Sequence, residues 1–289
     1  MTTRLSQADV ARYRRDGVLF PIRCFPEADM ARLARLHAEA ERRDGGRLLK
    51  RHNEKPHLLM RWLNDLIRDP AILDPVEDVI GPNILAWQSG FFAKHPGDGG
   101  YVSWHQDSTY WGLSPPDVVS AWIAFTPSTE ENGCMRVIPG SHVRDQLPHA
   151  DTFAANNMLS RGQEISVAVD ERQAVSIVLR PGEMSLHHVR MVHGSNANAG
   201  SVPRIGFTVR YLPTHVRQAS GARDSATLVR GVDSHGHFEH EPAPLDDFDP
   251  AAIAYHTRML EWQAQLRYAG AARGPAYEPI AAPDARTGG

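Results

Sequence analysis

The sequence predicts a mainly β fold, a barrel or jelly roll, with helices buttressing it from both ends of the chain. Many short strand-like segments lie between residues 84 and 211, and turns rich in glycine and proline separate them. Helical periodicity marks the segments before and after this region, an order typical of an α+β layout. The length of 289 residues suits one such domain, because β barrels reach this size.

The first part of the chain carries helix signals. Ser6 and Asp9 form a capping box that starts a helix, and Gly17 ends it. Pro26 opens a second helix with apolar residues at helical spacing. In total, helices are predicted over 6–16, 26–44, 57–68 and 70–80, with a strand over 18–22.

The predicted strands follow in the middle of the chain, where β-branched and aromatic residues alternate with turn clusters. They lie over 84–94, 101–107, 118–125, 135–142 with its turn, 164–169, 175–179, 183–187 and 205–211. Segment 214–249 is polar and turn-rich, so we expect a long loop region of the functional kind. A final helix is predicted over 250–268, and the tail 270–289 is expected to fray. We assign 1–289 to one domain with a core at about 5–213.

Composition and charge narrow the possible partners. The net charge of -3 and the pI near 6.6 give no basic field for nucleic acid. No apolar run is long enough to span a membrane and no signal peptide is evident, so we expect a cytoplasmic protein. Cys24 and Cys134 are too few for a disulfide scaffold and are expected to be buried. A monomer or homodimer acting on a small molecule fits these properties.

The stretch Trp104-His105-Gln106-Asp107 carries the chemistry. Alternation along a strand would place His105 and Asp107 on one face. An imidazole and a carboxylate on one face can hold a cation. A second imidazole completes a facial triad with open positions, which non-haem Fe(II) oxygenases favour. We expect His193, at the end of an apolar segment, to be this third ligand.

A His-x-Asp pattern alone is weak evidence for a metal site. A second one, His149-Ala150-Asp151, lies in a polar stretch, and we interpret it as a solvated loop. His187 and His188 precede His193, and we interpret them as core histidines or as neighbours of the ligands. Arg204 favours His193, because it opens a strand from which a fixed guanidinium could bind a dicarboxylate. On these residues alone, Arg204 could equally form a surface ion pair.

The spacing of His105, Asp107, His193 and Arg204 resembles the phytanoyl-CoA dioxygenase superfamily of Fe(II)- and 2-oxoglutarate-dependent oxygenases. The stretch Asn132-Gly133-Cys134-Met135-Arg136-Val137-Ile138-Pro139-Gly140-Ser141-His142 looks like a turn of that family, and the N-terminal order of helix, strand and helix is similar. The resemblance covers about residues 5–213. It implies a double-stranded β-helix that uses Fe(II), 2-oxoglutarate and O2.

The resemblance also implies roles for matching residues. The iron ligands would be His105, Asp107 and His193. The cosubstrate 2-oxoglutarate would be bound by Arg204, with Ser195 beside it, by Lys94, and in a pocket lined by Trp122. On sequence alone, Lys94 could be an ordinary strand-end lysine and Trp122 a core aromatic residue.

The substrate is less clearly marked. Gln88 resembles a position that faces substrate in related ectoine hydroxylases, and the loop with Tyr110 and Trp111 could cover the site. That loop also looks similar to hydroxylases of 2-aminoethylphosphonate type, which act on small zwitterions. Arg210 shares a strand face with Arg204 and could meet an anionic group, or form a salt bridge at the barrel rim.

The presence of Asp107 bears on the type of reaction. In related halogenases a small residue replaces this carboxylate, so the resemblance implies hydroxylation of an unactivated C–H bond or another oxidation. The substrate would be a polar or zwitterionic metabolite or a natural-product intermediate, and succinate and CO2 would be released. One alternative is a cupin-like divalent-metal isomerase or hydrolase, which would not need Arg204 and Lys94. The other is a non-catalytic ligand-binding relative, against which the intact triad argues.

Overall fold

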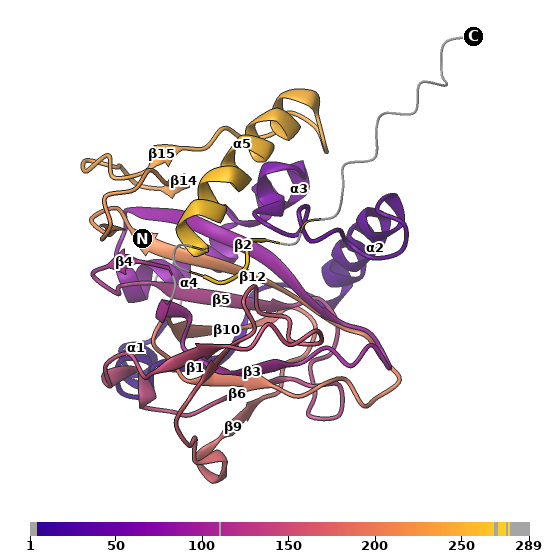
Figure 1. The fold of residues 1–289 in the computed structure, drawn as a ribbon, viewed down its shortest axis with the longest axis vertical. Helices are drawn as coiled ribbons and strands as arrows, with labels where there is room; N and C mark the ends of the chain where they lie inside the picture. The colour runs from indigo at the N-terminus through magenta and orange to yellow at the C-terminus, as the bar shows by residue number, and fades with distance from the viewer. Residues whose placement is uncertain (1–4, 110, 269–270, 276, 278–289) are drawn as a thin grey trace.

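The fold consists of two mainly antiparallel sheets, with helices along the larger one, in a computed structural model (Figure 1). The structure describes residues 5–109, 111–268, 271–275 and 277. Its α-helices are α1 (Gln7–Asp16), α2 (Glu27–Arg43), α3 (Arg61–Leu66), α4 (Pro70–Ile80) and α5 (Pro250–Arg267). None of the helices within these ranges is both long enough and apolar enough to cross a membrane.

The larger sheet has seven strands in the order β1-β10-β5-β12-β2-β14-β15. These are β1 (Val18–Arg23), β2 (Ile84–Lys94), β5 (Val119–Ala124), β10 (Glu183–His188), β12 (Arg204–Pro213), β14 (Ser225–Arg230) and β15 (Glu239–His240). The smaller sheet has the order β3-β11-β6-β9. Its strands are β3 (Val102–His105), β6 (Met135–Val137), β9 (Val175–Ile177) and β11 (His193–Ser195). Two short pairs are separate: β4 (Leu113–Ser114) with β13 (Arg217–Gln218), and β7 (His149–Asp151) with β8 (Gln163–Ile165).

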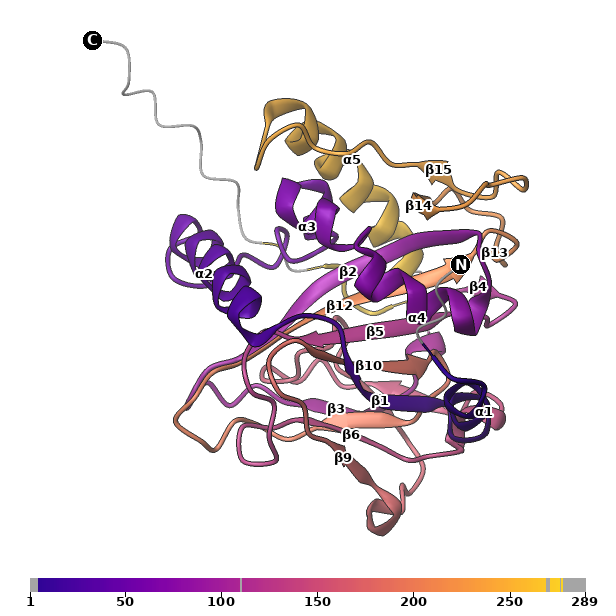
Figure 2. The same ribbon diagram turned by 180° about the vertical axis from the view of Figure 1, so that it is seen from behind.

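The larger sheet buries both faces, which explains its near-continuous apolar strands. In β5, Ala121 and Ile123 belong to a core shared with the helices. Trp122 and Ala124 point to the opposite face, where they pack with Val137 of the smaller sheet. Figure 2 shows α1 and α4 on the near side of the larger sheet. The face between the two sheets is therefore the one on which a buried site can form.

The central ladder between β2 and β12 contains a bulge. Arg210 is the register partner of Gln88, and the next residue, Tyr211, pairs with Ala86. Trp87 is thus an extra residue, and an extra residue lets two consecutive side chains share one side of a strand. Trp87 and Gln88 both line the same cleft.

Most predicted elements are present. Ser6 caps α1 by accepting a hydrogen bond from the Asp9 amide (3.1 Å), and Gly17 ends the helix with a φ of 73°. The helix expected over 57–68 is split into a 3-10 turn, η1 (Pro56–Leu58), and α3. Both cysteines are buried, as predicted, and neither forms a disulfide.

Two loop predictions were wrong. Region 214–249 contains β13, β14 and β15, because 225–230 adds a strand to the edge of β2. His149–Asp151 is also a strand, β7, paired with β8. The predicted tail, 270–289, lies largely outside the described residues.

Candidate metal and cosubstrate site

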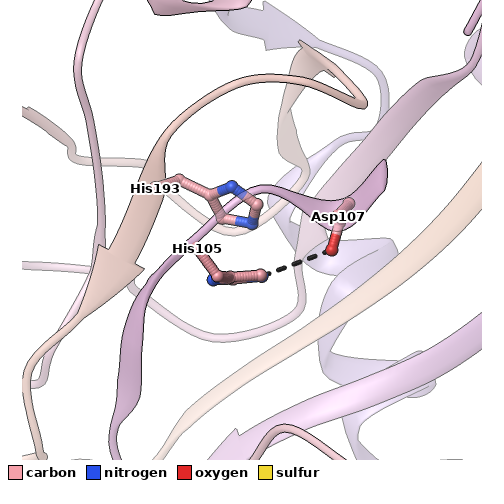
Figure 3. Close-up of side chains that lie close together, drawn as sticks. All are labelled: His105, Asp107 and His193. Atoms are coloured by element: carbon pink, nitrogen blue, oxygen red, sulfur yellow. Dashed lines mark hydrogen bonds and ion pairs between the residues drawn. The ribbon is translucent and has the colours of Figure 1, made fainter. Parts of the chain in front are cut away.

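The side chains of His105, Asp107 and His193 face one another in the interior, as Figure 3 shows. Among the described residues, this is the one group of three or more His, Cys, Asp and Glu side chains that could hold a metal ion. Their ligand atoms all lie within 4.8 Å of one another, and all three residues are buried. Two nitrogens and one oxygen converging in this way fit Fe(II), which is bound by such facial triads.

Two strands and a turn position the triad. His105 ends β3 and His193 begins β11, and the two are register partners across the smaller sheet. Asp107 does not lie in the strand as predicted, because the chain leaves β3 at Gln106 and Asp107 begins a 3-10 turn, η2 (Asp107–Thr109). The turn still brings an oxygen of Asp107 to 3.3 Å from His105 Nε2.

The orientation of both imidazoles suits metal binding. His105 Nδ1 lies 2.9 Å from the Ser103 carbonyl oxygen, and His193 Nδ1 lies 2.9 Å from the Met191 carbonyl oxygen. A carbonyl oxygen only accepts hydrogen bonds, so each Nδ1 carries the proton and each Nε2 keeps its lone pair. Such hydrogen bonds fix ligand histidines in metal sites.

The turn after His105 is held by the second His-x-Asp segment. The Gln106 amide donates to His149 Nε2 (3.0 Å), and Gln106 Nε2 donates to the Arg190 carbonyl (2.9 Å). His149 therefore supports the turn that carries Asp107, a role that its position in a polar stretch did not indicate.

The protonation states of the triad also favour binding of a metal ion. Burial opposes ionisation of Asp107, but the polar contact with His105, the neighbouring imidazole of His193 and the charge of Arg210 hold the pKa of this carboxyl well below its usual range. Burial, with the neighbouring His105, holds the pKa of His193 well below its ordinary value. A carboxylate and a neutral imidazole are the forms that bind a metal ion.

Two buried basic side chains, Lys94 and Arg204, form a pair near the triad. They are register partners on β2 and β12, so their side chains leave the sheet on the same side. Lys94 Nζ donates to Ser195 Oγ (2.6 Å), and Arg204 Nη1 donates to the Gly133 carbonyl (2.7 Å). Lys94 also donates to the Asn196 carbonyl.

The partners of this basic pair are neutral. Within the part of the chain that the structure describes, their hydrogen bonds go to the Ser195 hydroxyl and to backbone carbonyls, and no ion pair with a carboxylate involves either head group. Burial, together with the charge of Arg204, lowers the pKa of Lys94 to about 6, and burial lowers the pKa of Arg204 to about 10. Such a pair is stabilised by an anion, because buried charges normally require a counter-charge.

Trp122 completes this end of the site. Its ring centroid lies 5.4 Å from the Arg204 guanidinium carbon. A Cβ on Gly206 would lie 1.9 Å from the indole, so only glycine leaves room for it. One cavity is lined by Trp122, His193, Ser195 and Arg204, so it connects Arg204 of the basic pair with His193 of the triad.

An open cleft reaches the triad at Asp107, and its volume, which includes space open to solvent, is about 750 Å³. Asp107 lines it together with three of the predicted substrate residues, Gln88, Trp111 and Arg210. The fourth, Tyr110, lies outside the described residues. Sequence reasoning missed Glu54, which lines the same cleft and lies in an irregular segment without a pattern.

Comparison with known proteins gives a family match. A family model described as phytanoyl-CoA dioxygenase (PhyH) matches residues 13–206. A probable alpha-ketoglutarate-dependent hypophosphite dioxygenase of Stutzerimonas stutzeri is 30% identical over 165 residues, 56% of this chain and 57% of that protein. The peroxisomal phytanoyl-CoA dioxygenase of Homo sapiens is 32% identical over 133 residues, 45% of this chain and 39% of that protein. The chain thus spans about half the length of the curated relatives it matches.

Solved structures are similar over more of the chain. A non-heme monooxygenase, ThoJ in its apo form, has a TM-score of 0.80 and 34% identity, covering 91% of this chain and 99% of that one. CytC3 with Fe(II) and alpha-ketoglutarate has a TM-score of 0.63 and 27% identity, covering 86% and 98%.

Proposed function

Because the chain belongs to the phytanoyl-CoA dioxygenase family, we propose that it is an Fe(II)- and 2-oxoglutarate-dependent oxygenase whose two sheets form a double-stranded β-helix. One observation carries the proposal: His193 of the buried triad lines one cavity together with Arg204, and Arg204 belongs to a basic pair that has no carboxylate partner among the described residues. A metal and a dicarboxylate would satisfy both features.

In this proposal the triad binds Fe(II), and Arg204 and Lys94 bind the distal carboxylate of 2-oxoglutarate with Ser195. When bound, Fe(II) and 2-oxoglutarate supply the oxidising chemistry, in which O2 is consumed and succinate and CO2 are released. The protein residues orient the bound groups and shield them from water. Backbone carbonyls fix the two imidazoles, and Trp122 keeps water from the carboxylate end.

We propose hydroxylation of a C–H bond in a small polar or zwitterionic molecule, whether a metabolite or a natural-product intermediate. The relatives reported above are named for substrates as different as hypophosphite and phytanoyl-CoA, so the substrate class has to be inferred from the residues that line the cleft. Its wall beside Asp107 carries the amide of Gln88 and the guanidinium of Arg210. Trp111 and Tyr110 are proposed to cover the substrate.

The test is anaerobic addition of Fe(II) and 2-oxoglutarate, followed by the visible absorption band of the chelate. We expect a band in wild type that a metal chelator removes and that is lost or weakened in His193→Ala and Arg204→Ala. Arg172→Ala, which changes an exposed arginine paired with Asp170, is the control and should keep the band. A screen for substrates by succinate release would follow.

The same experiment separates the alternatives. A metal isomerase or hydrolase would bind a divalent ion without a band and would tolerate Arg204→Ala. A non-catalytic relative would release no succinate with any substrate. Absence of the band in iron-loaded wild type would contradict the proposed function.

A further inference from the structure

The inner face of the larger sheet carries a row of polar side chains. His187 of β10 is the register partner of Ser120 of β5, and Ser120 is also the partner of Arg210 of β12. Arg210 in turn pairs with Gln88 of β2. Register partners point to the same face of a sheet, so these four side chains lie next to one another. The alternate residues of β5 pack against the helices, so the row points toward the smaller sheet.

The row lies across from the triad, because two of the triad residues come from the smaller sheet. The His193 ring contacts the His105 ring, with centroids 4.1 Å apart, and also the His187 ring, with centroids 5.0 Å apart. A facial triad holds a metal ion from one side and leaves the positions on the other side open. The open positions are therefore expected to face the larger sheet, where His187 touches a ligand ring.

His187 and Ser120 both have a buried polar atom without a partner. His187 is 3% exposed and Ser120 is completely buried. Neither Nδ1 of His187 nor Oγ of Ser120 forms a hydrogen bond with any described residue. Buried polar groups are normally hydrogen-bonded. Two such atoms on adjacent strands, beside a ligand ring, thus indicate the site of a polar ligand.

The position of this pair limits the size of that ligand. Among the row residues, Gln88 and Arg210 line the open cleft, whereas Ser120 and His187 are not among its described lining residues. The distal carboxylate of 2-oxoglutarate is assigned to Arg204, six residues and about 20 Å along β12 from Arg210. Neither the substrate cleft nor that carboxylate therefore accounts for the two unpartnered atoms, and a small ligand at the metal does.

We propose that His187, with Ser120 beside it, donates a hydrogen bond to O2 bound in an open position of the metal, which makes His187 a further catalytic residue. Burial disfavours the charged form of an imidazole, and the neutral ring still offers one N–H donor. Dioxygen gains electron density when it binds a reduced metal ion, and donors beside it decide how well it is held. This inference rests on the proposed function and adds a binding site for its gaseous cosubstrate.

The experiment uses nitric oxide as a stand-in for O2, added to the anaerobic enzyme loaded with Fe(II) and 2-oxoglutarate. An absorption titration gives its dissociation constant, and electron paramagnetic resonance reports on the bound molecule. His187→Phe keeps a ring but removes both nitrogens, so it should weaken binding about tenfold, as expected for one lost hydrogen bond, and change the spectrum. His187→Gln keeps a donor and should recover most of the affinity. Ser120→Ala should weaken binding by a smaller factor, about threefold.

His37→Phe is the matched control. His37 is also completely buried, neither of its ring nitrogens forms a hydrogen bond with a described residue, and its ring packs against Phe91 in the core shared with the helices. This variant should bind nitric oxide as wild type does. The visible band of the chelate, recorded before nitric oxide is added, shows that each variant is folded and holds Fe(II) and 2-oxoglutarate.

Three outcomes would overturn the inference while the band persists: an affinity of His187→Phe within about twofold of wild type, an equal loss in His37→Phe, or no recovery in His187→Gln. Tighter binding in His187→Phe would show that the imidazole holds a coordinated water instead, and would also overturn it. Should His187→Phe lose the band, Ser120→Ala decides, because it removes only a hydroxyl. A missing band in wild type would overturn the proposed function, and this inference with it.

Discussion

Two of the three lysines in this chain are completely buried, and they differ in what surrounds the ammonium group. Lys55 lies 2.5 Å from a carboxylate oxygen of Glu241 and donates to the Ser225 carbonyl (2.8 Å). Lys94 donates to the Ser195 hydroxyl and to backbone carbonyls, and it shares its surroundings with Arg204. Lysine is rarely buried without a counter-charge, so the two sites separate a structural ion pair from a site for an anionic ligand.

The environment of Glu241 supports this distinction. Ser225 Oγ donates to Glu241 at 2.8 Å, and Thr227 Oγ1 donates to it at 2.6 Å. Burial opposes ionisation, but the charge of Lys55 lowers the pKa of Glu241 to about 2. The pair is closed and complete, and it ties the segment before η1 to β14 and β15. The site of Lys94, by contrast, has no counter-charge among the described residues, and in the proposed function a dicarboxylate would supply it.

The largest effect is expected from breaking the closed pair. Glu241→Gln leaves the Lys55 charge buried without a counter-charge, so the free energy of unfolding should fall by about 3–5 kcal/mol. Urea denaturation measures this loss. The double variant Lys55→Met/Glu241→Leu removes both charges and should recover most of it. Equal instability of the double and single variants would show that packing, and not the ion pair, stabilises this region.

Replacing Lys94, the buried lysine without a carboxylate partner among the described residues, should not destabilise the fold but should weaken cosubstrate binding. Lys94→Met removes a charge-assisted hydrogen bond to the ligand, so 2-oxoglutarate affinity should fall by about 1.5–3 kcal/mol, or about 10- to 150-fold. The free energy of unfolding should stay equal or rise, because no counter-charge is orphaned. Calorimetric titration measures the affinity for 2-oxoglutarate, and urea denaturation measures the free energy of unfolding. Lys50→Met, at an exposed lysine, is the control. A destabilised Lys94→Met variant would contradict the proposed difference between the two buried lysines.

The packing around the basic pair can be tested without changing a charge. The Cβ of Gly206→Ala would meet the Trp122 ring at 1.9 Å and displace it from Arg204. We expect a loss of about 1–3 kcal/mol in stability, as for other overpacked cores, together with weaker 2-oxoglutarate binding. Gly274→Ala, where an added Cβ meets nothing, is the control. Unchanged binding would show that Trp122 does not shape the cosubstrate pocket.

The smallest predicted effect is a pH dependence of 2-oxoglutarate affinity. The pKa of Lys94 is about 6 in the ligand-free site, and a bound dianion favours its protonated form. Above this pH the complex binds more protons than the free site, so raising the pH weakens binding, by at most about tenfold or 1.4 kcal/mol per unit. Titrations at several pH values from 6 to 8 should show this slope in wild type and not in Lys94→Met.

The same shift has a consequence for stability. The unfolded chain keeps the ordinary lysine pKa of 10.5, so between about pH 6 and 10.5 the unfolded state binds more protons at Lys94 than the folded state does. The contribution of this group to the unfolding free energy therefore rises with pH across that window. The unfolding free energies of wild type and Lys94→Met, plotted against pH, should converge as the pH increases. Parallel curves would contradict the lowered pKa of Lys94.

The sequence could predict that Lys94 and Arg204 come together, because both lie on long, regular strands. Lys94 ends β2 and Arg204 begins β12, and the structure pairs them directly. The triad also comes together, although Asp107 reaches it through a turn that strand alternation does not describe. The motif and the local strand geometry are sufficient to predict that these residues come together.

The substrate end could not be predicted in the same way. Glu54 lies in an irregular segment, and its position depends on hydrogen bonds with Gln88 and other residues distant in sequence. The strand β14 is short and flanked by polar residues, so its pattern resembled a loop until its pairing with β2 was seen. Tertiary contacts, and not periodicity, determine both features.

The bulge in β2 makes the shape of the cleft depend on the length of the strand. Deleting Trp87 would restore a regular ladder and remove one wall of the cleft, while the pairing from Gln88 to Lys94 would keep its register with β12. Insertion or deletion of a single residue can therefore remodel the substrate end without disturbing the cosubstrate end. Divergence among proteins built on this ladder is then expected in gaps of their alignments as well as in substitutions.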